Sequence, residues 1–156
     1  MSAITLMRLP TDTPHLKLHL LKGRFAICRL DAHEKTPSWA RRGAEFTSIT
    51  RTADELSVVC DEGLVPKRVK RESGWRIFKI EGPLDFALTG ILAAVAKPLA
   101  DAGVSIFVVS TYATDYLMVR EENVKKAARA PGGRARRRMP VGRRGHPSVA
   151  ADLQQS

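Results

Sequence analysis

Two segments of this chain resemble each other at a fixed offset, and this internal repeat constrains the fold more than any other feature. Residues 50–59 and 110–119 each begin with a small polar residue, place an alanine at a turn, continue to an acidic residue and end in an apolar run. Residues 23–27 and 74–78 form a second similar pair at a shorter offset. The repeat predicts one β-α-β-β unit used twice, with a much shorter helix in the first copy.

Neither copy is expected to fold alone. A single unit of this kind leaves one face of its sheet and one edge strand uncovered. Pairing of the two copies would cover both, so we expect the halves to lie together rather than as independent domains. The predicted fold class is α+β: two tandem ferredoxin-like halves with antiparallel sheets and helices packed on one face. The expected divisions are residues 1–72, 73–129 and a tail, 130–156.

The first half is predicted to be mostly short strands. Leu16, Leu18 and Leu20 alternate with polar residues, which is typical of a strand with one buried face. Residues 52–55 separate two apolar runs at a spacing that suits a hairpin. The predicted strands and extended segments are 16–20, 24–30, 46–51, 56–60 and 64–70, and one helical turn is expected at 39–42.

The second half contains the main helix. An amphipathic helix is predicted over residues 85–102, with Asp85 as its N-cap and Gly103 as its C-terminal stop. Its apolar face is formed by residues at helical spacing: Leu88, Ile91, Leu92, Val95 and Leu99. Strands are expected at 75–80, 104–110 and 116–119, and a second helix at 121–128.

The net charge of +10 is concentrated at the C-terminus. From Arg129 onward there are seven arginines and one acid, a net of +6. The tail has almost no large apolar residues and cannot bury enough surface to offset the entropy of ordering it, so it is predicted to be disordered. It either binds polyanions weakly through its arginines or is a solvated appendage.

Composition favours a globular protein of the cytoplasm. Hydrophobic residues make up 44% of the chain and charged residues 27%. No apolar run reaches membrane-spanning length, no secretory signal is recognised, and so no membrane association is expected. Cys28 and Cys60 lie in apolar runs, where buried reduced thiols are expected.

No catalytic or metal-binding motif was found. The four histidines have no metal-ligand spacing, and the chain lacks CxxC, a phosphate-binding loop and a GxSxG serine. We therefore expect no metal, no cofactor and no catalysis by this chain. Trp39 and Trp75 either stack against a ligand or pack in a core or interface, and packing is the favoured expectation.

Two longer stretches, residues 74–92 and 103–119, resemble a bacterial family of tandem ACT-domain proteins. They also resemble the ACT modules of the eukaryotic arginine sensors called CASTOR proteins. The resemblance covers most of residues 16–128 and implies a regulatory module that binds an amino acid or a similar small ligand. Those sensors have four ACT modules and this chain has two ACT-like halves, so an interface of four modules would require a homodimer.

The resemblance also implies which residues bind the ligand. ACT domains typically bind an amino acid at the loop after the first strand and at an interface between modules. The residues carried over are Glu81, Gly82, Pro83, Leu84 and Asp85 in that loop, with Ser110, Thr111, Tyr112 and Asp115 in the partner stretch.

Elementary chemistry leaves alternatives open for these residues. Free backbone amides before a helix favour a carboxylate, and Gly82 permits close approach to the backbone. Asp85 is either an ammonium acceptor or a helix cap. Asp115 either pairs with a cationic ligand group or bonds within its own hairpin. The alternative functions are nucleic-acid binding through the basic tail and regulation of a separate enzyme by protein contact.

Overall fold

The structure, a computed structural model, describes residues 4–7, 16–81 and 90–130. Its first half contains β1 (Ile4–Met7), β2 (Leu16–Leu20), β3 (Phe25–Leu30), the 3-10 turn η1 (Ser38–Arg41), β4 (Ser48–Arg51), β5 (Leu56–Asp61) and the 3-10 turn η2 (Glu62–Leu64). The remaining elements are β6 (Lys70–Ile80), α1 (Ile91–Asp101), β7 (Phe107–Ser110), β8 (Asp115–Arg120), the 3-10 turn η3 (Glu121–Asn123) and α2 (Val124–Arg129).

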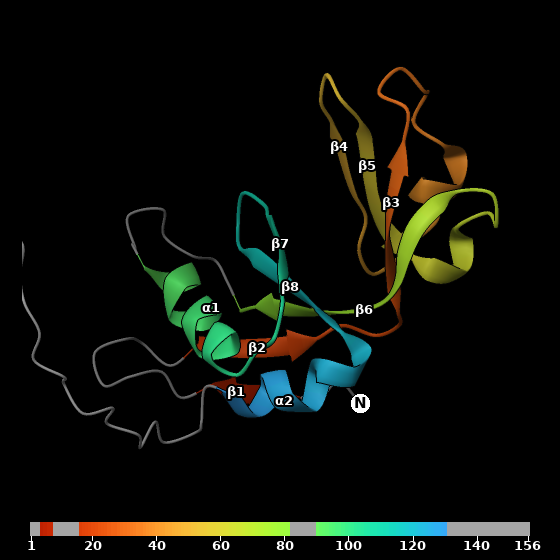
Figure 1. Ribbon diagram of the computed structural model, residues 1–156. Coiled ribbons are helices and arrows are strands. Elements are labelled where there is room, and N and C mark those ends of the chain that lie inside the picture. Colours follow the sequence, from red (N-terminus) through yellow and green to blue (C-terminus); the bar gives the residue numbers. More distant parts are fainter. Residues whose placement is uncertain (1–3, 8–15, 82–89, 131–156) are drawn as a thin grey trace, which may run out of the picture.

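All the strand pairs are antiparallel, and together they form one eight-stranded sheet that branches at β6. One path runs β1-β2-β6-β3-β5-β4, while β8 pairs with the other edge of β6 and β7 pairs with β8. The pairing orders β3-β5-β4 and β6-β8-β7 are alike, although the first half has the 3-10 turn η1 where the second half has α1. Figure 1 shows β3, β4 and β5 in one arm, and α1, β2 and α2 in the other, with the long strand β6 running through both. The predicted α+β class with a ferredoxin-like antiparallel sheet is confirmed.

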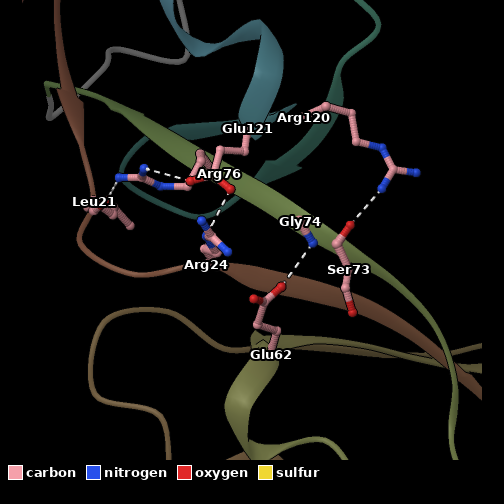
Figure 2. Close-up of polar contacts among 8 residues, drawn as sticks. All are labelled: Leu21, Arg24, Glu62, Ser73, Gly74, Arg76, Arg120 and Glu121. Carbon is pink, nitrogen blue, oxygen red and sulfur yellow. Dashed lines mark hydrogen bonds and ion pairs between the residues drawn. The ribbon is translucent and has the colours of Figure 1, made fainter.

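Strand β6 changes direction at a bulge that both halves stabilise. Its register against β3 shifts between Phe25 and Ile27, and Gly74 has a φ of 80°, a conformation that favours glycine. The Gly74 N–H donates to the Glu62 carboxylate at 2.9 Å, and the Arg120 guanidinium donates to the Ser73 carbonyl at 2.7 Å. Both side chains point to the bulge in Figure 2. The predicted boundary between residues 72 and 73 falls just before this bulge, inside β6.

A carboxylate beside the bulge joins two further segments. Glu121 accepts from the Arg24 Nε at 2.8 Å and lies 3.9 Å from the Arg76 guanidinium, which also donates to the Leu21 carbonyl. Figure 2 shows Arg24 and Arg76 converging on Glu121. The turn between β2 and β3 is therefore tied to η3, although these segments are far apart in the sequence.

Three hydrophobic clusters form the core. One lies between the sheet and the two helices and includes Phe78, Ile80, Val95, Leu99 and Leu117. A second lies under η1, on the face of β3 and β5 that carries both cysteines. The third contains residues of both halves: Phe25, Val59, Trp75, Ile77 and Met118. Strand alternation explains the division, because neighbouring residues on β6 and on β8 point to opposite faces.

Phe46 strengthens the shared cluster. Its ring meets Phe25 edge-on at 6.3 Å between centroids and lies 4.7 Å from the ring of Tyr116 on β8. These aromatic contacts join the first half to the second. The two halves thus pack together, as the uncovered faces predict.

The main helix starts later than the sequence pattern predicts. Gly90, with a φ of 80°, is the N-cap of α1, and a continuous helix cannot pass through a residue in that conformation. The expected start at Asp85 is therefore wrong for α1; Asp85 and Leu88 themselves lie outside the described residues. The buried face is Ile91, Val95 and Leu99, whereas Leu92 is exposed.

The end of α1 is as predicted. Gly103 has a φ of 71°, its N–H donates to the Ala100 carbonyl, and the Val104 N–H donates to the Leu99 carbonyl. These two bonds form the Schellman motif that ends many helices.

Three other expectations need correction. The extended segment expected at 64–70 is a strand only at Lys70, where β6 begins: η2 ends at Leu64, a turn follows at Pro66, and Arg71 donates to the carbonyls of Val65 and Pro66. Local hydrogen bonds to side chains here replace the strand pairing. Strand β7 begins at Phe107 rather than at Val104, which packs in the core after the helix. The predicted helix at 121–128 divides into η3 and α2.

Candidate ligand site

The predicted site residues lie at the end of β6 and in the β7–β8 hairpin. Glu81 directly follows β6, Ser110 is the last residue of β7 and Asp115 the first of β8, with Thr111 and Tyr112 in the turn between them. Gly82, Pro83, Leu84 and Asp85 lie outside the described residues, so their predicted roles remain predictions.

A buried hydrogen bond holds these two regions together. The Thr114 hydroxyl donates to the carbonyl of Ile80 at 2.7 Å. Thr114 is only 4% exposed, and among the residues that the structure describes it is the one polar residue that is buried. This bond fixes the hairpin turn next to the last residues of β6. The structure therefore brings Glu81 and the Ser110–Asp115 hairpin to the same end of the sheet.

Hydrogen bonds within the hairpin set its shape. The Ser110 hydroxyl donates to the Asp115 carboxylate at 2.5 Å. The Thr111 hydroxyl donates to the Thr114 carbonyl at 3.0 Å, and the Thr111 N–H donates to the same carbonyl. The side chain of Thr111 is thus used in the turn, and Asp115 bonds within its own hairpin. Asp115 remains half-buried and Tyr112 is 88% exposed.

Glu81 has two basic neighbours on β2. Its carboxylate lies 3.6 Å from Lys17 Nζ and 3.9 Å from His19 Nε2, and its N–H donates to the Lys17 carbonyl. The Lys17 and Glu81 side chains are about half exposed, so this contact contributes little stability. It does place a carboxylate and two basic groups together at the strand end.

A groove of about 400 Å³ adjoins Ser110 and separates the two hairpins. One wall comes from β4 and β5, including Ser48, Thr50 and Ser57, and the other is β7 from Phe107 to Ser110. The walls combine hydroxyl groups with apolar side chains. Pockets of this size and mixture commonly hold small molecules that carry a few polar groups.

Two sequence-based expectations concern the metal-ligating side chains and the cysteines. The described residues contain no group of three or more metal-ligating side chains. Cys28 and Cys60 are free and buried, as expected. A hydrogen bond to Cys28, together with burial, raises the pKa of the Cys60 thiol, which disfavours the reactive thiolate. In the part of the chain that the structure describes, no helix has the length and apolarity needed to cross a membrane.

Reasoning from sequence missed three residues of this region: Thr114, Lys17 and His19. Lys17 and His19 alternate with leucines, so the pattern identifies them as one polar face of a strand. Only the pairing of β2 with β6 places that face beside Glu81. For Thr114, no local pattern distinguishes a buried hydroxyl from an exposed turn residue.

Comparison with known proteins agrees with this architecture. A family model of the ACT domain matches residues 70–130, and a model of an N-terminal domain matches residues 23–68. A solved structure of an Agobacterium tumefaciens protein is 45% identical, with a TM-score of 0.72, covering 77% of this chain and 89% of that one. The aspartate kinase of Clostridium acetobutylicum shares the fold, at 14% identity and a TM-score of 0.52, over 80% of this chain and 34% of the kinase.

Curated relatives are similar over a shorter stretch. The protein named "Cytosolic arginine sensor for mTORC1 subunit 1" is 30% identical over 95 residues in both Bos taurus and Homo sapiens. The match covers 54% of this chain and 29% of either relative, so the chain spans less than a third of their length. The matched ACT-domain model and the ferredoxin-like β6-α1-β7-β8-α2 unit therefore identify residues 70–130 of this chain as an ACT domain.

Proposed function

We propose that this protein is a regulatory sensor that binds a free amino acid and does not catalyse a reaction itself. One observation carries the proposal: the Thr114–Ile80 hydrogen bond, which brings the Ser110–Asp115 hairpin to the strand end that carries Glu81. The ACT-domain match over residues 70–130 and the similarity to a protein named as an arginine sensor support a regulatory role.

The chemistry of the region suits a zwitterion. Glu81 and Asp115 supply carboxylates for an ammonium or guanidinium group. Backbone amides in the segment 82–85 would supply donors for the ligand carboxylate. The groove beside Ser110 provides hydroxyl groups and apolar walls for the rest of the molecule.

Thermal unfolding tests the proposal. The full chain is heated with each of the twenty amino acids at millimolar concentration. A ligand that binds only the folded state at about 100 times its Kd stabilises that state by roughly 2.7 kcal/mol. We expect one amino acid, or a small related group, to raise the Tm by several degrees.

A pair of variants locates the binding. Asp115→Asn removes the hairpin carboxylate, whereas Asp101→Asn makes the same chemical change on exposed α1, where Asp101 only pairs with Lys97. We expect the ligand-induced shift to be lost in the first variant and retained in the second. Equal shifts in both variants, or no shift with any amino acid, would contradict the proposal.

We also propose a cytoplasmic homodimer. In the described sheet β4 and β7 are edge strands, and each exposes one large apolar residue, Ile49 and Phe107, which also line the groove beside Ser110. Edge strands of this kind favour pairing with another chain. Analytical ultracentrifugation across micromolar concentrations, with and without the ligand, would reveal the dimer. A monomer under all of these conditions would refute it.

A further inference from the structure

The first half contains a second cavity, of about 510 Å³, away from the candidate site. It lies where β3 ends, between η1, the β4–β5 turn and the residues that lead into β6. Its lining includes the ring of Trp39, which is half-buried, and the apolar side chains of Leu30 and Val69. The cavity is formed entirely by described residues.

Hydrogen bonds fix the loop that forms one wall. The Arg51 guanidinium donates to the carbonyls of Ala32 and Glu34, the latter at 2.7 Å. The Asp31 carboxylate accepts from the His33 N–H at 2.9 Å, and the Asp31 carbonyl accepts from the Glu34 N–H. These four hydrogen bonds shape a short loop without a regular helix, so this wall of the cavity is formed without a ligand.

Charges of both signs line this cavity, and four of them lack a partner. Arg29 is paired with Glu55 at 3.2 Å. By contrast, Glu34, Asp54, Arg68 and Lys70 are exposed, and their side chains make no hydrogen bond or ion pair with any other described residue. Two carboxylates and two cations therefore line the same cavity as Trp39, which also packs against the second core cluster.

We propose that this cavity is a second ligand site, which binds a small zwitterion. The ligand carboxylate pairs with Arg68 and Lys70, its cationic nitrogen pairs with Asp54 and Glu34, and its apolar part lies against Trp39. A singly charged ligand would meet two like charges as well as two opposite ones, so the lining favours a dipolar molecule. The site is independent of the one proposed at Glu81 and Asp115.

The topology supports this assignment. The cavity is at the end of β3 and beside the β4–β5 turn, and the candidate site is at the end of β6 and beside the β7–β8 turn. Because β3-β5-β4 and β6-β8-β7 pair in the same order, the two places correspond.

NMR of the 15N-labelled full chain tests the proposal through the indole N–H of Trp39. The resonance is assigned by its loss in Trp39→Phe, and Trp75, only 8% exposed in the shared core, serves as an internal reference. Each of the twenty amino acids is titrated to millimolar concentration. We expect a saturable shift of the Trp39 signal with at least one of them. No shift with any of the twenty would overturn the proposal.

Ligand analogues and variants then test the two charge contacts. The amine and the carboxylic acid analogues of the best probe, each lacking one charged group, should bind more weakly than the amino acid. Arg68→Gln and Asp54→Asn should each raise the Kd about tenfold, while Lys125→Gln and Asp101→Asn, outside the cavity, should not. Unchanged affinity in both cavity variants would overturn the proposal. Asp115→Asn should leave the Trp39 shift intact, which separates failure of this site from failure of the proposed function.

Discussion

The hydroxyl of Thr114 gives the sharpest test of how this fold positions its candidate site. It donates to the Ile80 carbonyl in a buried place, and the two residues are 34 positions apart in the chain. Thr114→Val keeps the shape of the side chain but removes the donor. The Ile80 carbonyl then loses this buried partner, and one contact between the hairpin turn and β6 disappears.

The size of the effect follows from the burial. Removing one partner of a buried hydrogen bond costs about 1–3 kcal/mol, because the remaining group is desolvated without compensation. In a domain of this size, about 1 kcal/mol lowers the Tm by roughly 4 °C. We therefore expect Thr114→Val to lower the Tm by about 4–12 °C. Differential scanning calorimetry of the full chain, without ligand, measures the change.

Two control variants make the test specific. Thr114→Ser retains the hydroxyl and should recover a large part of the lost stability. Thr50→Val makes the same substitution at an exposed position of β4 and should change the free energy of unfolding by less than about 0.5 kcal/mol. Equal Tm values for Thr114→Val and Thr50→Val would refute the reasoning and show that the Thr114 bond does not stabilise the fold.

Three further predictions concern the bulge and the thiols. Gly74→Ala should lower the free energy of unfolding, measured in urea, by about 1–2 kcal/mol. The reason is the φ of 80° rather than a clash, because no atom lies within 4 Å of the added Cβ. Ser73→Ala, at the exposed neighbouring position, should leave the stability nearly unchanged, and equal effects of the two substitutions would contradict the role of φ. Glu62→Ala should destabilise by about 1–3 kcal/mol, because the Gly74 N–H loses its charged acceptor, and a stability unchanged in chemical denaturation would refute this. Cys28 and Cys60, 1% and 0% exposed, should react with a thiol reagent only as fast as the protein unfolds; rapid labelling of the native protein would show that the cysteines are accessible.

The sequence predicted the local elements well where short-range chemistry decides them. Alternation of apolar residues identified β2, an apolar run at hairpin spacing identified β5, and Gly103 marked the end of α1 because a left-handed residue closes the Schellman motif. The start of that helix was misplaced, since the apolar spacing extends to Leu88 while the left-handed Gly90 interrupts the helix. The spacing of apolar residues indicates which face of a helix is buried, but it does not indicate the backbone φ angle of a single glycine.

The candidate site was predicted only in part. The hairpin residues Ser110 and Asp115 stand out in the sequence through the repeat and the family resemblance. Their neighbours could not be found in that way, because Lys17 and His19 come from β2, far from Glu81 in the chain. Strand pairing between distant segments depends on the whole sheet, and no local pattern encodes it.

By itself the sequence determined the α+β class, the two hairpins, the repeated order of elements and the expectation that the halves share a core. Only the tertiary structure decided how they join: through one strand bent at Gly74, with Glu62 from the first half and Arg120 from the second binding the free polar groups of the bulge. The physical reason is that a backbone amide or carbonyl removed from strand pairing needs a partner, and the partner is whichever side chain the completed fold brings within reach.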